Sequence, residues 1–352
     1  MEGLQRCNPV GVAVTFKRQC MNKVKISHIS SFFDNTTRIS NETIEKLINK
    51  NTTLLPPGVL DRLFGIRNRF FTDDGVQCSD LAAGAARNIL KEVDATTIDC
   101  MIFAAASSDL IEPATANIVQ LKLGLNCPVF DVKNACNSFV SAMQVASSFI
   151  KSGQYKKVLI TNGEILKNAI TFDIADSAEL MRRLASFTLG DAGTAAILEP
   201  SDDESGIIYH EMRSLGEYWE LCVIPGGGSM FPQDCSKHFF EGKTSELREV
   251  FIREKGEMFE RCFRETGFTR EDIDHFFIHQ VSKSTVKAMA DDLNIPIEKF
   301  HCIIEEYGNT AAASIPLSID LAIKSGKLKK GQKVIIIGLA AGISMSVQLM
   351  IW

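Results

Sequence analysis

The sequence is organised around the stretch Val129-Phe130-Asp131-Val132-Lys133-Asn134-Ala135-Cys136-Asn137-Ser138-Phe139. This stretch is typical of an apolar strand, a short turn, a cysteine and the beginning of a long helix. The helix is predicted because apolar residues recur at helical spacing: Phe139, Ala142, Met143, Ala146, Phe149 and Ile150. Gly153 predicts where that helix ends. We therefore expect Cys136 to lie at or next to a helix N-terminus.

That position allows two interpretations of Cys136. The aligned peptide dipoles and free N–H groups of a helix N-terminus stabilise an anion, which lowers the pKa of a thiol and favours the nucleophilic thiolate. The alternative is a buried cysteine that packs as a small apolar residue. The choice depends on whether a base and an oxyanion site are found elsewhere in the chain.

The overall composition is that of an ordinary globular protein with one large or two medium domains. Of the 352 residues, 45% are hydrophobic and 23% are charged. The net charge of −5 gives no basic footprint for nucleic acid, and no segment approaches the roughly 18 consecutive apolar residues of a membrane span. The 10 cysteines include no Cys-x-x-Cys pair, so we expect neither a metal site nor a disulfide framework. Reduced thiols favour a cytoplasmic location.

The chain is expected to divide into two halves after a short extension. Pro9–Val14 is too short for a secretory signal, and Met21–Ile26 resembles a fresh start into a first strand. The polar and acidic segment Ser201–Ser205 indicates a seam. We therefore expect an extension outside the fold at residues 1–20, a first half at 21–200 with the nucleophile cysteine, and a second half at 201–352.

Hydrophobic periodicity predicts alternating helices and strands on both sides of this seam. Helices are expected over Asn41–Asn49, Ser79–Val93, Ala114–Leu123, Ser245–Thr266, Ser282–Leu293 and Ala312–Ser325. Strands are expected over Val24–Ser30, Asp99–Ala106, Lys157–Thr161, Gly206–Met212, Phe276–Ile278 and Lys333–Gly338, with a Gly-rich turn and strand at Thr188–Leu198 and a final strand to Trp352. We expect Pro113 to be the first residue of its helix and Leu60–Phe71 to contain a loop with two positive charges. The alternation predicts an α/β fold with covered central sheets.

Three polar residues stand at strand ends or in loops, where α/β folds place their chemistry. Cys136 is the first, His279 follows a short apolar run, and Asn309 precedes an Ala-rich helix. A thiol with an imidazole forms a nucleophile–base pair, and an amide can orient a substrate or donate to an oxyanion. On chemistry alone the triple is a weak signal, since a histidine at a strand end is often structural.

Several motifs in their order resemble the β-ketoacyl-ACP synthase III branch of the thiolase-like condensing enzymes. The stretches are Asp131–Phe139, Gly190–Gly193, His279-Gln280-Val281-Ser282, Tyr307–Pro316 and Gly338–Trp352. The resemblance extends from about Met21 to Trp352. It implies a thiolase-like five-layered αβαβα fold of two similar halves, and a homodimer.

The resemblance also implies the roles of these residues. Cys136 is expected to take an acyl group from acyl-CoA or from a phosphopantetheine-linked acyl carrier protein (ACP), without a bound cofactor. His279 and Asn309 are expected to hold the extender thioester and stabilise its enolate. The backbone N–H groups of Cys136 and Ala341 are expected to form the oxyanion hole. The expected reaction is a Claisen condensation in fatty acid or polyketide-type biosynthesis.

Two groups of residues concern how the substrate is bound. Val59 and Leu63 stand where the resemblance implies a Trp and an Arg that clamp the CoA adenine, and Ser284 replaces a basic residue. These departures favour carrier-protein donors or longer acyl groups over acetyl-CoA. Basic residues that could contact phosphopantetheine or an acidic carrier are Arg67, Arg69 and Lys283, although solvated surface charges are an equal interpretation.

The presence of Glu112 leaves open how the enolate that attacks the acyl group is formed. A glutamate at Ile111-Glu112-Pro113 resembles the subgroup that joins two acyl chains to make olefin precursors or α-pyrones. In that subgroup the glutamate removes an α-proton, so no decarboxylation is needed. The alternative is a carboxylate favoured by the first turn of a helix. Two further alternatives remain for the whole chain: acyl transfer from Cys136 to an oxygen or nitrogen acceptor, and an inactive partner subunit of a heterodimeric synthase.

Overall fold

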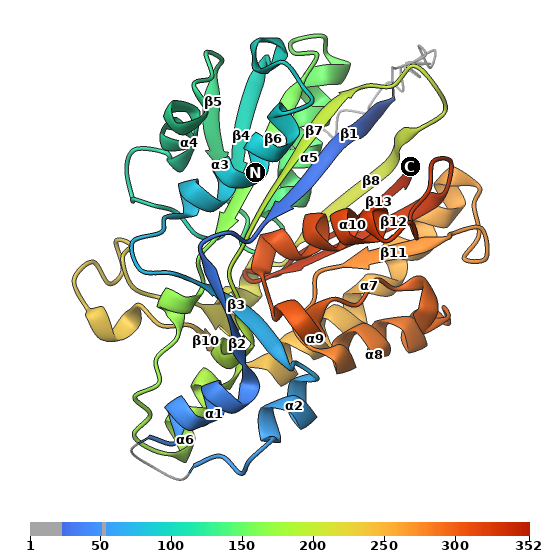
Figure 1. The fold of residues 1–352 in the computed structure, drawn as a ribbon. Coiled ribbons are helices and arrows are strands. Elements are labelled where there is room, and N and C mark those ends of the chain that lie inside the picture. The colour runs from blue at the N-terminus through green and yellow to red at the C-terminus, as the bar shows by residue number, and fades with distance from the viewer. Residues whose placement is uncertain (1–22, 51–53) are drawn as a thin grey trace, which may run out of the picture.

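The computed structural model describes residues 23–50 and 54–352, which fold around two β-sheets (Figure 1). The expected extension at 1–20 lies outside the described residues. The first sheet has the strand order β1-β7-β6-β4-β5. Its strands are β1 (Val24–Phe32), β4 (Cys100–Ala104), β5 (Val129–Val132), β6 (Val158–Glu164) and β7 (Ala192–Pro200). Parallel pairing of β4 with β5 and β6 places the carboxyl ends of these three strands at one edge of the sheet.

The second sheet is formed entirely by the later part of the chain, in the order β11-β12-β13-β8. Its strands are β8 (Gly206–Ser214), β11 (His275–Ile278), β12 (Lys333–Ala340) and β13 (Ser344–Ile351). Strands β12 and β13 form an antiparallel hairpin, and β11 pairs with β12 in parallel. The carboxyl ends of β11 and β12 therefore lie side by side.

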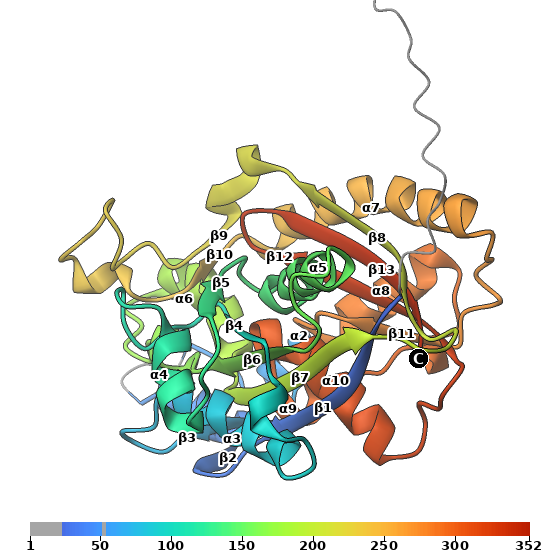
Figure 2. The ribbon, with the colours of Figure 1, turned by 90° about the horizontal axis from the view of Figure 1, so that it is seen from above.

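Helices separate and cover the two sheets (Figures 1 and 2). The helices are α3 (Cys78–Leu90), α4 (Thr115–Leu123), α5 (Ser138–Lys151), α7 (Thr244–Thr266), α8 (Lys283–Leu293) and α10 (Ser314–Lys324). Helices α5 and α10 share one apolar core with strands of both sheets, so they form the middle layer. A second core joins α3 and α4 to the first sheet, and a third joins α7 and α8 to the second sheet. These five layers confirm the predicted thiolase-like αβαβα fold.

The predicted long helices and strands are confirmed, whereas Leu60–Phe71 was only partly predicted. This segment contains α2 (Val59–Phe64) and β3 (Asn68–Thr72), and β3 pairs with β2 (Thr36–Ser40). The prediction that Pro113 begins its helix is wrong, since α4 begins at Thr115. The Asp131 carboxylate of β5 accepts the N–H groups of Thr115 and Ala116 at 2.9 and 2.8 Å, so a residue from another strand caps this helix.

A smaller group of elements closes over the edge of the sheets where the strands end. It comprises α1 (Asn41–Ile48), α2, α6 (Ser177–Arg183), β9 (Cys222–Val223) and β10 (Glu241–Gly242). Apolar residues of α1, α2 and α6 form a separate cluster with residues of neighbouring segments, and this cluster includes Ile44, Leu60, Leu180 and Phe187. This cluster forms part of the wall around the site described below.

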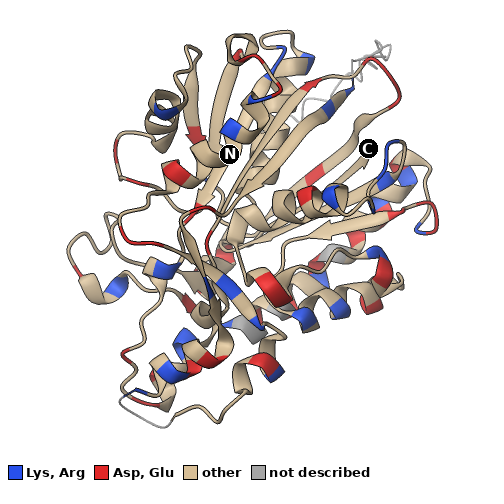
Figure 3. Ribbon diagram, in the orientation of Figure 1, with Lys and Arg blue, Asp and Glu red and all other residues tan. Residues whose placement is uncertain are grey.

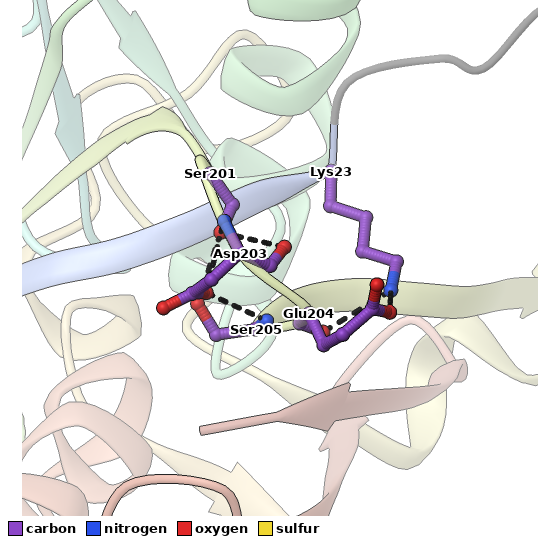
Figure 4. A network of polar contacts seen from close by, with 5 residues as sticks. All are labelled: Lys23, Ser201, Asp203, Glu204 and Ser205. Carbon is purple, nitrogen blue, oxygen red and sulfur yellow. Dashed lines mark hydrogen bonds and ion pairs between the residues drawn. The ribbon is translucent and has the colours of Figure 1, made fainter.

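The predicted seam at Ser201–Ser205 is the segment that connects β7 of the first sheet to β8 of the second, and polar contacts hold it in place (Figure 4). Asp203 accepts from the Ser205 backbone N–H at 2.9 Å and pairs with Lys330 at 2.8 Å, and Lys23 pairs with Glu204. The ion pair with Lys330 holds the pKa of Asp203 well below its usual range. The division of the chain at this segment into two related halves remains a prediction.

Candidate active site

Cys136 lies in the tight turn between β5 and α5. The preceding Ala135 has φ +46°, a left-handed conformation that is strained for any residue with a Cβ. The backbone N–H groups of Cys136 itself and of Ala341 act on the thiol to lower its pKa. Burial nevertheless raises the pKa of the Cys136 thiol, and the neighbouring Cys222 and Glu164 raise it further. The expected lowering by the helix start is therefore wrong, because desolvation of the thiolate outweighs the N–H groups.

His279 lies directly after β11 and is 4% exposed. Its Nδ1 lies 2.9 Å from the Ser314 hydroxyl, and this hydroxyl donates to the Ala311 carbonyl at 2.8 Å. Because the single hydroxyl proton of Ser314 is used in that bond, its oxygen accepts from an Nδ1–H of His279. Burial lowers the pKa of His279 to about 4. At neutral pH the ring is therefore neutral, with Nε2 as a proton acceptor.

The loop that carries Asn309 is held by backbone hydrogen bonds to the segment around Thr188 and Gly190. Its backbone N–H donates to the Thr188 carbonyl at 2.7 Å, and its own carbonyl accepts from Gly190 at 3.0 Å. The preceding Gly308 has φ +66°, and a Cβ there would lie 2.8 Å from the Thr188 oxygen. The Asn309 side-chain oxygen accepts from the Ala311 N–H at 3.0 Å. This bond leaves the side-chain NH₂ as the group that can donate to a substrate.

Ala341 lies in the turn between β12 and β13, which also has a strained backbone. Ile343 in this turn has φ +40°, and Ala311, two residues after Asn309, has φ +44°. Together with Ala135, three residues that carry a Cβ and have positive φ flank the elements that hold Cys136, Asn309 and Ala341. Such strain is found preferentially at functional sites, where the surrounding structure holds it in place.

Cys136, His279, Asn309 and Ala341 all line one cavity of about 570 Å³. Its walls are mainly apolar and include Leu166, Leu189, Val223, Phe240, Phe251 and Met289. Toward the surface the walls include Leu63, Ile224 and Ile252, which are 46%, 47% and 43% exposed. The cavity can therefore hold an apolar chain beside a thiol, an imidazole and an amide.

Two residues near the nucleophile, one partly and one fully buried, were not predicted from the sequence. Cys222 of β9 lines the cavity, and burial raises the pKa of its thiol to about 12. Glu164, fully buried at the end of β6, accepts the N–H groups of Ala106, Ser107 and Ala312 at 2.8, 3.0 and 3.3 Å. Neither residue stands in a recognisable motif, although a glutamate at the end of an apolar strand is a weak signal for a functional site.

The basic residues expected to contact the substrate lie in different surroundings. Arg67 and Lys283 are exposed, and both pair with Glu305, the Lys283–Glu305 distance being 3.2 Å. Arg69 is fully buried and donates to the Phe187 carbonyl and to Asn41 Oδ1, and burial lowers its pKa to about 9. The prediction that Arg69 contacts phosphopantetheine or a carrier is therefore wrong, because strand β3 turns its side chain into the interior.

Surface charges of both signs lie on the outer helices, whereas the sheets carry few charges (Figure 3). Positive and negative residues intermix on α7 and α8 in this view. Leu63 and Ser284, predicted to replace basic residues, both line the cavity. At these two positions the cavity wall is therefore apolar or neutral rather than basic.

Glu112 is exposed on the loop between β4 and α4 and does not line the cavity of its own chain. Leu110 and Ile111 beside it are 51% and 87% exposed. A catalytic role for Glu112 therefore requires that this loop meets the cavity of another chain.

Within residues 23–50 and 54–352, no three or more His, Cys, Asp or Glu side chains are grouped so that they could hold a metal ion. The same residues contain no helix with the length and apolar character needed to cross a membrane.

Known proteins resemble this chain over nearly its whole length. The 3-oxoacyl-[acyl-carrier-protein (ACP)] synthase III family matches residues 130–216, and its C-terminal region matches residues 263–352. The β-ketoacyl-[acyl-carrier-protein] synthase III of Koribacter versatilis is 33% identical over 324 residues, which cover 89% of this chain and 93% of that protein. The enzyme of the same name from Neisseria gonorrhoeae is 30% identical over 333 residues, 92% of this chain and 97% of its own.

Solved structures of OleA from Xanthomonas campestris share the fold. A cysteine-to-serine variant with bound lauric acid and lauroyl-CoA has a TM-score of 0.85 and 27% identity, covering 94% of this chain and all of that chain. Variants of OleA in which a glutamate is replaced by alanine or glutamine have the same TM-score at 26% identity. The chain belongs to the β-ketoacyl-[acyl-carrier-protein] synthase III family of thiolase-fold enzymes, acyltransferases that form carbon–carbon bonds by Claisen condensation of acyl thioesters.

Proposed function

We propose that this chain condenses acyl thioesters through an acyl-Cys136 intermediate, with His279 as the proton carrier and Asn309 as the donor to the attacking thioester. The observation that carries the proposal is the convergence of Cys136, His279, Asn309 and the Ala341 N–H on one apolar cavity. The donor is an acyl-CoA or acyl-ACP, no cofactor is bound, and the reaction takes place in the cytoplasm.

In the first half-reaction, the Cys136 sulfur attacks the thioester carbonyl of the donor. Because burial raises the thiol pKa, the proton has to leave as the bond forms, and neutral His279 accepts it at Nε2. The backbone N–H groups of Cys136 and Ala341 hold the tetrahedral oxyanion. The bond from the carbonyl carbon to the donor sulfur then breaks, and His279 returns the proton to the departing thiolate.

In the second half-reaction, the side-chain NH₂ of Asn309 holds the carbonyl oxygen of the extender thioester. Loss of CO₂ from a malonyl unit leaves its electron pair as an enolate, which attacks the acyl carbon on Cys136. The Cys136 thiolate leaves and takes a proton from solvent through His279. In this mechanism His279 does not act as the expected second donor to the extender, because its ring proton lies at Nδ1 and faces Ser314.

A second candidate function is favoured by the likeness to OleA and by Glu112. The Glu112 carboxylate would remove the α-proton of a second acyl thioester, the resulting enolate would attack acyl-Cys136, and the proton would pass to the leaving Cys136 thiolate. Since Glu112 does not line the cavity of its own chain, this route requires a homodimer in which each copy presents its Glu112 loop to the other. The exposed Leu110 and Ile111 supply an apolar contact for that dimer.

Intact-protein mass spectrometry with lauroyl-CoA tests the proposal. We expect one lauroyl adduct on Cys136, which malonyl-ACP discharges with release of CO₂ or a second lauroyl-CoA discharges without it. Glu112→Gln is expected to abolish only the second discharge, whereas the exposed control Glu298→Gln leaves both unchanged. Absence of any adduct on Cys136 would refute both candidates.

A further inference from the structure

We infer that Asn137 is a positioning residue that sets the spacing between the two oxyanion donors, the backbone N–H groups of Cys136 and Ala341. This inference rests on the proposed function, because it concerns the oxyanion formed when Cys136 is acylated. The two donors come from elements about 200 residues apart in sequence, the β5–α5 turn and the β12–β13 turn. Something has to fix the distance between these two turns.

The Asn137 side chain joins them directly. It is fully buried, and its amide donates to the Ser344 hydroxyl at 3.1 Å and accepts from the Ser346 hydroxyl at 2.9 Å. Ser344 is the first residue of β13 and lies three residues after Ala341. Both polar ends of a residue adjacent to the nucleophile are thus bonded to the strand that begins beside the second donor.

The second sheet has a glycine, Gly338, where the Asn137 side chain packs against it. Gly338 of β12 is paired with Ser346 of β13. A Cβ at Gly338 would lie 1.9 Å from Asn137 Oδ1 and 2.3 Å from the Ser346 hydroxyl, so a larger residue there would push the amide away. Gly338 lies just before Leu339 and Ala340, which lead into the β12–β13 turn. The close contact with Gly338 therefore places the Asn137 amide next to the strand that leads into this turn.

A second asparagine supports the same arrangement. Asn134, two residues before Cys136, donates to the Ser344 hydroxyl at 3.1 Å and to the Ser141 hydroxyl at 2.9 Å. Ser344 therefore accepts from the residues on both sides of the nucleophile turn. Loss of the Asn137 amide would leave only the Asn134 bond between the turn and β13, and the gap between the two N–H donors would be free to widen.

Two reactions of the Cys136 sulfur distinguish a role of Asn137 in the oxyanion hole from a role in general stability. Acylation by lauroyl-CoA passes through an oxyanion, whereas alkylation by iodoacetamide displaces iodide at carbon and forms none. For Asn137→Ala we expect the rate of acylation to fall about 10-fold or more, since loss of one oxyanion donor costs roughly 10²–10³. The rate of alkylation is expected to fall less than the rate of acylation, because alkylation forms no oxyanion and is affected only through the action of the Ala341 N–H on the thiol.

The experiment measures both rates at Cys136 by mass spectrometry of the digested protein, because the exposed Cys235 and Cys302 are also alkylated. The proteins compared are the wild type, Asn137→Ala, Ser346→Ala and the double variant. Ser346→Ala removes only the donor to Asn137 Oδ1, so it tests the same contact if Asn137→Ala does not fold. We expect Ser346→Ala to lower acylation selectively, and the double variant to lose no more than Asn137→Ala. The control Asn49→Ala removes an amide that bonds Leu54 and Leu55 away from the cavity, and should change neither rate.

The inference is overturned if acylation and alkylation fall by the same factor, or if neither rate changes in Asn137→Ala and Ser346→Ala. A wild type that is alkylated at Cys136 but takes no lauroyl group would instead refute the proposed function.

Discussion

Because the loop that carries Asn309 lies close to Thr188, we expect Gly308→Ala to lower the stability of the protein strongly. An added methyl group is unfavourable at this position for two reasons. The backbone there has φ +66° and ψ −166°, a region essentially restricted to glycine, and costs a residue with a Cβ about 1–3 kcal/mol. The Cβ would also lie 2.8 Å from the Thr188 carbonyl oxygen, and relieving such overpacking costs about 1–3 kcal/mol. The sum is a loss of about 2–6 kcal/mol in the free energy of unfolding.

Gly326→Ala is the control for a positive φ without a close contact. Gly326, after the end of α10, has φ +69°, but no heavy atom lies within 4 Å of its added Cβ. This control should lose only about 1–2 kcal/mol and keep full activity. For a chain of 352 residues, 1 kcal/mol corresponds to roughly 1–2 °C in the melting temperature.

The activity of Gly308→Ala should change at one step only. Relief of the clash moves Asn309 away from the extender but leaves the Cys136 turn intact. We therefore expect acylation of Cys136 to persist, while discharge by the extender slows by about 10-fold or more. Equal losses of stability in Gly308→Ala and Gly326→Ala, or unchanged discharge in Gly308→Ala, would refute this reasoning.

Three further predictions concern pH, cavity shape and the carbanion. Burial lowers the pKa of His210, His279 and His301 to about 4, so between pH 6.5 and 4 these histidines bind more protons in the unfolded chain. For His279, the most buried of the three, urea denaturation should show a loss of about 1–2 kcal/mol in the free energy of unfolding from pH 7 to 5 that is absent in His279→Gln. The same pH dependence in the wild type and in His279→Gln would contradict the shift of His279. Ala288→Trp places a large ring in the cavity wall. The rate of acylation by lauroyl-CoA should therefore fall about 10-fold, while the rate of acylation by acetyl-CoA changes little. Equal losses for the two donors would argue against an acyl chain at that wall. If Glu112 is the base, Glu112→Gln should lower condensation of two lauroyl-CoA molecules by about 10²-fold or more, and wild-type rates of product formation would exclude that role.

The sequence was sufficient for the parts of the site that lie within motifs. Cys136, His279 and Asn309 each follow an apolar strand or precede a helix, so local patterns placed them at element ends, and the structure brings all three to one cavity. The five layers could be predicted because long periodic segments determine which faces are buried.

Contacts made only on folding could not be predicted in this way. The pKa of Cys136 is raised because folding buries its thiol beside residues distant in sequence, among them Cys222 and Glu164. Arg69 was expected among surface charges, but pairing of β2 with β3 directs it to the buried carbonyl of Phe187. Asn137 carries no local signal either, since its partners Ser344 and Ser346 lie more than 200 residues later.

We propose that the acyl group passes through Cys136 before the new carbon–carbon bond forms. To test this step, the wild type is incubated with lauroyl-CoA, excess donor is removed, and the protein is digested to determine which peptide carries the acyl group. We expect one lauroyl thioester on Cys136 that disappears as the condensation product forms on adding the extender, and no adduct or product with Cys136→Ala. Condensation product formed by Cys136→Ala, or by a wild type whose Cys136 is never acylated, would contradict an acyl-Cys136 intermediate.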